Sequence, residues 1–211
     1  KRAELVNKVK RSQLTKEHSN WLSKLLPILF LSLLATSIFS LMQSALPLDL
    51  VAGGIFRPAL NEGWSGAILS IQLCLLVIFQ WPIGRWLSEH NQGFGLFISV
   101  LNFCIGCLLL GISALWVKGI VLAVIAQIPL AIGLAAFLPT ATEAIIKAPP
   151  IEHRGIAMAM FSQCFAISAL FAPPIAGIVL DKYGTGMLIW LVMSLACFIM
   201  LPLTRLITTN P

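Results

Sequence analysis

The chain has 211 residues, of which 58% are hydrophobic and only 10% are charged. Soluble domains carry about 25% charged residues, so this composition excludes a chain covered by a water-facing surface, and with it most soluble enzymes. The net charge of +6 does not indicate a nucleic-acid partner, because much of it lies near the start, where it favours a cytosolic segment beside anionic lipid headgroups. The basic residues of this segment are Lys1, Arg2, Lys8, Lys10, Arg11 and Lys16.

A polar leader over residues 1–20 is followed by six apolar stretches that fill the rest of the chain. Each stretch has about the 20 residues that a spanning helix needs at about 1.5 Å per residue, and none has the alternation typical of barrel strands. The sequence therefore predicts an all-α membrane protein, with six transmembrane helices in one domain over residues 21–211. The helices are expected at residues 24–46, 64–88, 94–116, 120–142, 155–180 and 186–207.

The distribution of basic residues predicts the orientation. Six crossings place both ends of the domain on one side, and eleven basic residues fall on that side against three on the other, which are Arg57, Lys118 and Lys182. Because basic residues concentrate in cytosolic connections, we expect a multi-pass protein of the plasma (inner) membrane, embedded in the lipid bilayer with both ends in the cytosol. The chain opens with Lys1 rather than Met, and we expect a processed chain or a piece of a longer one.

Two connections on the non-cytosolic side shape the expected fold. The longest lies at residues 47–63, where Asp49, Arg57 and Glu62 make it polar. The turn at residues 181–184 is short, and it predicts that the fifth and sixth helices form an antiparallel hairpin.

Small residues recur at every fourth position on two expected helices. Such stripes let helix backbones approach closely, so they predict packing faces; a face that slides during transport is the alternative. The stripes are Ala136, Thr140 and Ala144 on the fourth helix and Ser168, Ala172 and Ala176 on the fifth.

Ionisable residues are almost absent from the middle of the expected helices. An enzyme inside the bilayer would need clustered His, Asp or Glu, or a Ser with a base. We therefore expect no enzyme, no catalytic residue, no metal site and no cofactor. Cys104 and Cys107 form a C-x-x-C, but its apolar surroundings contain no basic residue that would lower a thiol pKa, so a structural role is expected.

Uncharged polar side chains do occur at depth, one on each of five helices. Each is unfavourable in hydrocarbon unless it meets a partner or a water-filled cavity. The pattern is compatible with a shared aqueous cleft, but for each glutamine taken separately the favoured interpretation is a hydrogen bond between helices, which contributes about 0.6 kcal/mol on average. The residues are Gln43, Gln72, Asn102, Gln127 and Gln163.

Three passages match patterns of one transporter family. Residues 82–90, PIGRWLSEH, are similar to an eroded G-x-L-x-D-R-x-G-R-R loop, with Gly84 kept and Ser88 near the position of the Asp. Residues 149–155, PPIEHRG, are similar to the P-x-x-x-R-G start of a fifth or eleventh helix, and residues 172–184, APPIAGIVLDKYG, to the pattern G-P-x-x-G-G-x-L-x-D-x-x-G. Together they resemble one six-helix half of a major facilitator superfamily (MFS) transporter, and the third passage resembles drug:proton antiporter-like members.

The resemblance favours the C-terminal half of such a transporter. The family's loop motif is usually best preserved in the first half and is eroded here. Many proton-coupled members carry an Arg in the fourth helix, and residues 120–142 have none. The basic leader is similar to the cytosolic linker between the halves, so the resemblance implies that the missing N-terminal half is a partner.

The resemblance also implies a 3+3 inverted repeat, with two halves that rock around a site at the bilayer midplane. Family geometry places the first, second, fourth and fifth helices against the cavity and leaves Asn102 outside it. The substrate-cavity candidates are Gln43, Gln72, Gln127 and Gln163.

Residues at the cytosolic helix ends are candidates for the inner gate of such a transporter, although ordinary helix-end charges beside the headgroups are an equally good interpretation. Glu143 is the one acid expected within such an end, and the hypothesis is that it pairs with Arg85 or Arg154 to hold the outward-open state. The gate candidates are Gly84, Arg85, Glu89, Glu143 and Arg154. A helix-kink motif, expected to bend the fifth helix, comprises Pro173, Pro174 and Gly177.

The function implied by the resemblance is secondary active transport of a small-molecule substrate by alternating access, with efflux as the expected direction. The neutral polar candidates favour an uncharged, amphipathic or cationic solute. A complete six-helix channel is an alternative, although the sequence has no paired Asn-Pro-Ala and no carbonyl-filter motif. A non-transporting receptor or scaffold is a further alternative.

Overall fold

The computed structural model describes residues 2–208, with side chains from Trp21 onward apart from residues 206 and 208. The basic side chains predicted to mark the leader lie outside the described residues. Six long helices and one short 3-10 helix make up the described chain, which contains no strand, and all six are long and apolar enough to span a membrane. The predicted fold class is confirmed. The elements are α1 (Arg2–Ala52), α2 (Glu62–Leu87), α3 (Gln92–Ser113), α4 (Gly119–Lys147), η1 (Ile151–His153), α5 (Arg154–Tyr183) and α6 (Met187–Thr208).

The first helix ends later than the sequence predicts. α1 passes Pro47 and continues to Ala52, because spanning helices tolerate proline where neighbouring groups satisfy the freed carbonyl. The helix stops at Gly53, whose φ of 86° is a left-handed conformation that glycine adopts without steric strain, and whose N–H donates to the Asp49 carbonyl. The polar connection therefore shortens to residues 53–61, and Asp49 belongs to the last turn of α1 instead.

The α1–α5, α2–α4 and α3–α6 pairings follow an inverted repeat, whereas the extensive α3–α4 contact has a much smaller counterpart between α1 and α6. α1 packs mainly against α5, and α2 mainly against α4, while α3 packs against both α6 and α4. An inverted repeat exchanges α1 with α4, α2 with α5 and α3 with α6. Under this exchange the α1–α5 pair becomes the α4–α2 pair, and the α3–α6 pair is unchanged. Each triplet crosses the bundle three times, so the second triplet starts from the other side and runs in the inverted sense.

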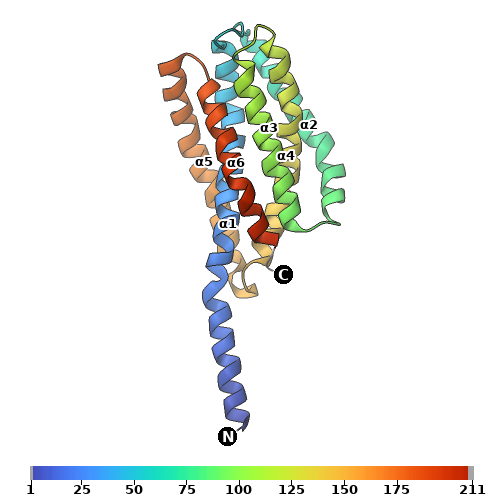
Figure 1. Ribbon diagram of the computed structural model, residues 1–211, viewed down its shortest axis with the longest axis vertical. Helices are drawn as coiled ribbons and strands as arrows, with labels where there is room; N and C mark the ends of the chain where they lie inside the picture. The colour runs from blue at the N-terminus through green and yellow to red at the C-terminus, as the bar shows by residue number, and fades with distance from the viewer. Residues whose placement is uncertain (1, 209–211) are drawn as a thin grey trace.

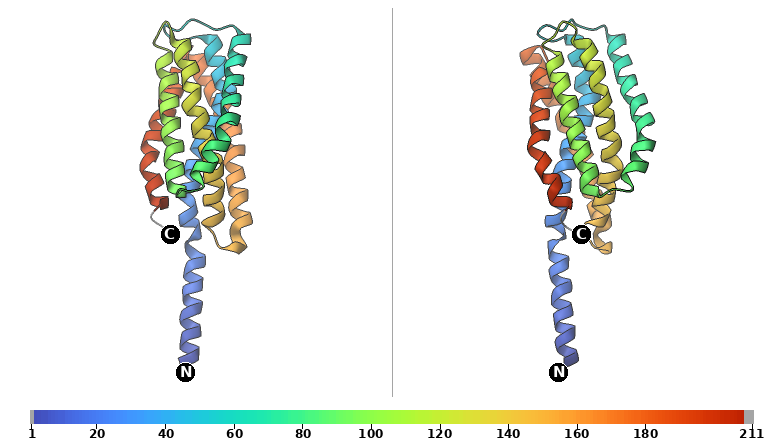
Figure 2. Two further views of the ribbon diagram at one scale, coloured as in Figure 1. Left: turned by 90° about the vertical axis from the view of Figure 1, so that its right-hand side faces the viewer. Right: turned by 45° about the vertical axis from the view of Figure 1, so that its right-hand side comes forward.

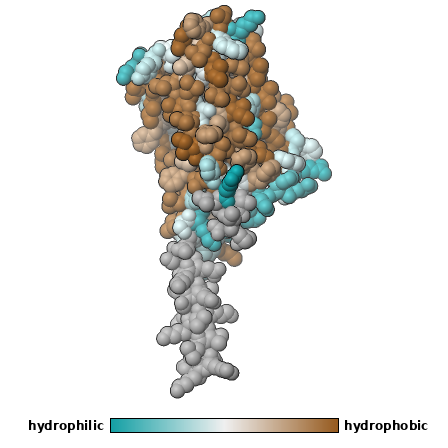
Figure 3. All heavy atoms as spheres, viewed as in Figure 1, coloured by the Kyte–Doolittle hydropathy of each residue, from teal (hydrophilic) through white to brown (hydrophobic). Residues whose placement is uncertain are grey.

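Both ends of the described chain lie at one side of the bundle (Figure 1, Figure 2). We call this the terminal side; the α2–α3 and α4–α5 connections also lie there. The α1–α2, α3–α4 and α5–α6 connections lie at the other side, which we call the opposite side (Figure 1). Apolar residues dominate the surface between the two sides (Figure 3), as expected for a face in contact with hydrocarbon.

The small-residue stripes are packing faces, as predicted. On α4, Thr140 lies against Gly95 of α3 so closely that a Cβ at Gly95 would be 2.6 Å from the Thr140 hydroxyl. On α5, the stripe lies on the helix that packs against α1. All six predicted stripe residues are buried: Ala136, Thr140, Ala144, Ser168, Ala172 and Ala176.

α5 and α6 are consecutive antiparallel helices, as the short turn predicts, but they have little direct contact. α5 is held by α1, and α6 by α3. A groove of about 440 Å³ therefore remains between α5 and α6, with α1 as its floor.

Candidate functional site

The structure divides the four predicted cavity glutamines into two groups. Gln43 on α1 and Gln163 on α5 are exposed, whereas Gln72 on α2 and Gln127 on α4 are buried in the bundle. Asn102 on α3, predicted to lie outside the cavity, is half-buried and donates to a carbonyl of its own helix. Only Gln43 and Gln163 are thus accessible in this conformation without a movement of helices.

The two buried glutamines have incomplete hydrogen bonding. Gln72 Nε2 lies 3.6 Å from the Met42 sulfur on α1, which is a weak acceptor. Gln127 Nε2 donates to the Ala123 carbonyl at 2.8 Å, and Gln127 Oε1 has no partner. Buried polar atoms without full partners destabilise a fold, so these two amides mark a polar zone inside an otherwise apolar bundle.

Gln43 points outward between α2 and α5. Thr36 contacts α5 through Ser168, and Met42 contacts α2. At 3.6 residues per turn, the direction of Gln43 around α1 is about 20° from that of Thr36 and about 100° from that of Met42, between the two. Ser44, which is half-buried, lies beside it. α1 therefore presents a polar strip, formed by Gln43 and Ser44, at a depth where hydrocarbon would favour apolar side chains.

A hydroxyl network joins α1 to α5 beside this strip. The hydroxyls of Thr36 and Ser168 lie 2.8 Å apart, and those of Ser37 and Ser168 lie 3.1 Å apart. The Thr36 hydroxyl also lies 3.2 Å from the Cys164 carbonyl and donates to it. These contacts are hydrogen bonds between α1 and α5, and the Thr36 hydroxyl also lies 2.8 Å from the Ser32 carbonyl of its own helix.

We expect Ser168→Ala to lower the free energy of unfolding by only about 0.6 kcal/mol, the average for interhelical hydrogen bonds in membranes. Ser168→Leu should lower it much more, because Ser168 is 1% exposed and a larger side chain would separate α1 from α5. The Tm of the purified protein measures both effects. The control is Ser162→Leu at an exposed position of α5; equal Tm values for the two Leu variants would contradict the packing of α5 on α1.

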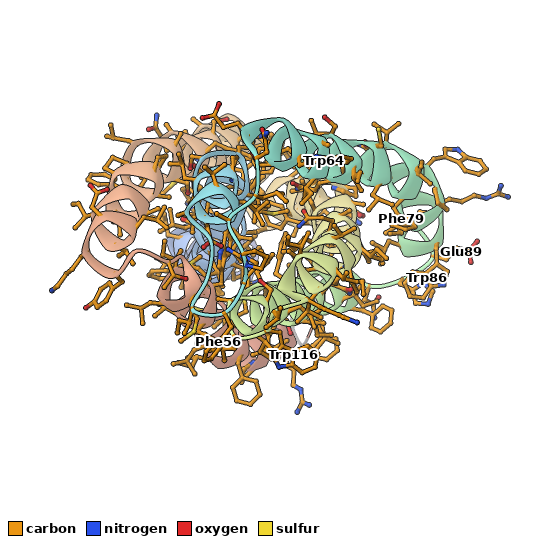
Figure 4. The ribbon with its side chains drawn as sticks, turned by 90° about the horizontal axis from the view of Figure 1, so that it is seen from above. Phe56, Trp64, Phe79, Trp86, Glu89 and Trp116 are labelled. Atoms are coloured by element: carbon orange, nitrogen blue, oxygen red, sulfur yellow. The ribbon has the colours of Figure 1, made fainter. Side chains whose placement is uncertain are left out.

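The predicted gate residues lie near the terminal side but do not form a cluster. Arg85 lies over the ring of Trp81 in its own helix, with 5.9 Å between Cζ and the ring centroid. Glu89 is exposed and points away from the bundle (Figure 4). Arg154 is exposed at the start of α5. A Cβ at Gly84 would meet no atom within 4 Å, so no close approach explains this glycine.

The hypothesis that Glu143 pairs with Arg85 or Arg154 is wrong for this conformation. Glu143 instead forms an ion pair with Lys147 of the same helix. Residues four apart are neighbours on a helix surface, and both side chains are exposed, so this pair is local and weak. In this conformation Glu143 is a helix-end charge, and its role in an inner gate stays a prediction.

α5 continues through the predicted helix-kink motif. Arg154–Tyr183 forms one helix, in which Pro173 is half-buried and Pro174 is exposed. A Cβ at Gly177 would meet no atom within 4 Å. The bend expected at this motif stays a prediction.

A buried ion pair at the opposite side was missed by the sequence prediction. Asp49 and Arg57, expected to make a connection polar, are 1% and 2% exposed. Arg57 Nη2 lies 3.0 Å from Asp49 Oδ1 and donates to the Asp49 carbonyl at 2.8 Å. Arg57 Nη1 donates to the Ser113 hydroxyl at the end of α3, at 2.7 Å.

The Asp49 carboxylate also binds the start of α6. Its Oδ1 accepts the N–H of Gly186 at 2.7 Å, and its Oδ2 accepts the indole N–H of Trp190 at 3.0 Å. The ion pair thus joins α1, α3, α6 and the 53–61 connection, which crosses the bundle end in Figure 4. Because both carboxylate oxygens have donors, the pair holds helix ends together. The described residues contain no group of three or more His, Cys, Asp or Glu suited to a metal ion.

Two features of the sequence could have indicated this pair. Asp49 and Arg57 lie eight residues apart in an apolar region, where opposite charges are expected to pair with one another. Gly53 and Gly54 between them let the chain turn back, since the Gly54 N–H donates to the Arg57 carbonyl at 2.9 Å. A Cβ on Gly54 would lie 2.6 Å from Ala114 Cα, which explains why a residue without a side chain is needed there.

The spanning helices and their inverted triplets define a multi-pass membrane protein with a transporter-type fold. The family model of the Major Facilitator Superfamily matches residues 25–211. The chain therefore belongs to the Major Facilitator Superfamily, and the predicted family is confirmed. A search of curated proteins finds no match to the chain. The antiporter-like subtype and the C-terminal position stay predictions.

Proposed function

We propose that this chain is one six-helix half of a secondary active transporter that moves a small solute by alternating access. The observation that carries the proposal is the exposure of Gln43, which lies in the second half of the α1 span Trp21–Ala52, a span that is otherwise one of the most buried in the bundle. An exposed amide is unfavourable in hydrocarbon but stable against water or a polar solute. The strip around Gln43 is therefore proposed to line the transport cavity.

The proposed partner is a second six-helix half that faces this strip, with this chain as the C-terminal half. α2 and α5, which flank the strip, are only slightly covered by the rest of the bundle. The uncovered side of α5 carries small residues, including Ala166, Ala169 and Gly177, which would let a helix of the partner approach closely.

The proposed solute is uncharged, amphipathic or cationic, because the strip offers amide and hydroxyl groups and no ionised side chain. Efflux is the proposed direction, supported by the similarity of residues 172–184 to the antiporter-like pattern. The excess of basic residues at the terminal side supports a cytosolic location for that side, in a plasma (inner) membrane.

We expect Gln43→Leu to slow counterflow of labelled tetraphenylphosphonium, a cationic amphipathic solute, by about three- to tenfold in proteoliposomes of the full-length protein. The reason is the loss of one neutral hydrogen bond, which contributes about 0.5–1.5 kcal/mol. The matched control is Asn102→Leu on α3, which should leave the rate unchanged. A Gln43→Leu rate equal to that of Asn102→Leu would remove Gln43 from the cavity.

The same assay separates the alternatives. Counterflow requires a site that is exposed to the two sides of the membrane in turn. A channel passes solute without counterflow, and a receptor or scaffold passes no solute at all. Labelling of Gln43→Cys by an impermeant thiol reagent tests the cavity without any assumption about the solute. Protection of that cysteine in the full-length protein would contradict a water-filled cavity at this strip.

A further inference from the structure

The groove between α5 and α6 has apolar walls. Among the described residues, the polar residues of its walls are Ser37 and Ser168, and their hydroxyls hydrogen-bond to one another, so they need no ligand. Elsewhere the walls are aliphatic or aromatic side chains, such as Ile175 on α5 and Val192 on α6. Both of these side chains are more than half exposed, so the groove opens on the surface of the described bundle.

The length of the groove matches one leaflet of a bilayer. Its α5 wall extends from Ile167 to Val179, which is about 18 Å at 1.5 Å per residue. The hydrocarbon of one leaflet is about 15 Å thick. Since Ile167 lies near the middle of α5, the groove extends from the middle of the bundle to its opposite side, which is the depth of one leaflet.

A positive charge lies beyond the opposite-side end of the groove. Lys182 is seven residues after Ile175, which places it within about 20° of Ile175 around α5 and about 10 Å further along. Its Nζ lies 5.4 Å from the ring centroid of Tyr183. α6 begins at Met187, and the partial positive charge of a helix N-terminus also favours an anion there. The adjacent acid, Asp181, is turned about 100° away around the helix.

We propose that the groove holds one acyl chain of a membrane phospholipid, with the phosphate group of that lipid at Lys182 and the start of α6. An apolar channel of leaflet length, with a cation at its headgroup end, is complementary to a phospholipid in both shape and charge. The bound chain fills the space between α5 and α6 and supplies dispersion contacts that the two helices do not make with each other. The lipid thereby stabilises the arrangement of α5 against α6.

Photo-crosslinking tests this site. The full-length protein is reconstituted in vesicles that contain phosphatidylglycerol with a diazirine on one acyl chain, and the cross-linked residues are mapped by mass spectrometry. We expect cross-links to concentrate on Ile175, Val179, Leu188 and Val192. Ile175→Trp, which fills the groove, should lower them at least threefold, whereas Leu195→Trp, at an equally exposed position of α6 outside the groove, should not.

Substitution of the two exposed lysines of the opposite side tests the headgroup contact. Lys182→Gln should lower groove cross-linking at least twofold and reduce the rise in Tm that phosphatidylglycerol gives to the detergent-purified protein. Lys118→Gln, at the α3–α4 turn, should change neither. Cross-links spread evenly over α6, no effect of Ile175→Trp, or cross-links between protein segments across the groove would each overturn the proposal; the last result would show that protein covers it.

Discussion

Asp49→Asn should lower the free energy of unfolding by about 3–5 kcal/mol, because it leaves the buried guanidinium of Arg57 without a counter-ion. Asn keeps the size of the side chain, so little of the effect would come from packing. Arg57 is 2% exposed, and its remaining acceptors, the Asp49 carbonyl and the Ser113 hydroxyl, are neutral. The Tm of the purified full-length protein is the measurement, together with the yield of folded protein.

A double-mutant cycle separates the ion pair from a general loss of packing. The variant Asp49→Asn with Arg57→Gln should lose less stability than the two single variants added together, because neither charge is left alone. The control is Glu143→Gln, which breaks an exposed pair and should change stability by no more than about 0.5 kcal/mol. Strict additivity of the two single effects would show that the pair has no coupling.

The spanning helices were predictable because their signal is strong and local. A run of about 20 apolar residues has few alternatives to a helix across the bilayer. The small-residue stripes could be assigned to packing faces because their four-residue spacing is also a local signal. The end of α1 was not predictable from Pro47. It depends on the left-handed Gly53 and on the contacts of Asp49 with α6, which arise only when distant segments meet.

The candidate site was predictable by residue type but not by position. A glutamine within an apolar run indicates a polar role, yet periodicity alone does not say whether it faces a neighbour, as Gln72 does, or the exterior, as Gln43 does. Glu143 shows the same limit for charges, since its partner Lys147 lies one turn away. The Asp49–Arg57 pair was missed because charges in a connection were assumed to face water. In the structure both side chains are buried instead.

Gly119→Ala should lower the free energy of unfolding by about 3 kcal/mol, at the upper end of the usual range for overpacking. Gly119 begins α4, and a Cβ there would overlap the backbone carbonyl of Ser113 and lie 3.3 Å from Arg57 Cγ. A backbone carbonyl cannot rotate away as the end of a flexible side chain can. The α3–α4 turn must therefore shift, and it carries with it the Ser113 hydroxyl that binds Arg57.

The control for Gly119→Ala is Gly155→Ala at the start of α5, where a Cβ would meet no atom within 4 Å. It should leave the Tm unchanged or slightly raised, because Ala favours a helix more than Gly does. Combining Gly119→Ala with Asp49→Asn should give less than the sum of the two effects, since both disturb the contacts of Arg57. Additive losses would show that Gly119→Ala strains the α3–α4 turn without disturbing Arg57. A Tm of Gly119→Ala equal to that of Gly155→Ala would contradict the close approach of Gly119 to the Ser113 carbonyl.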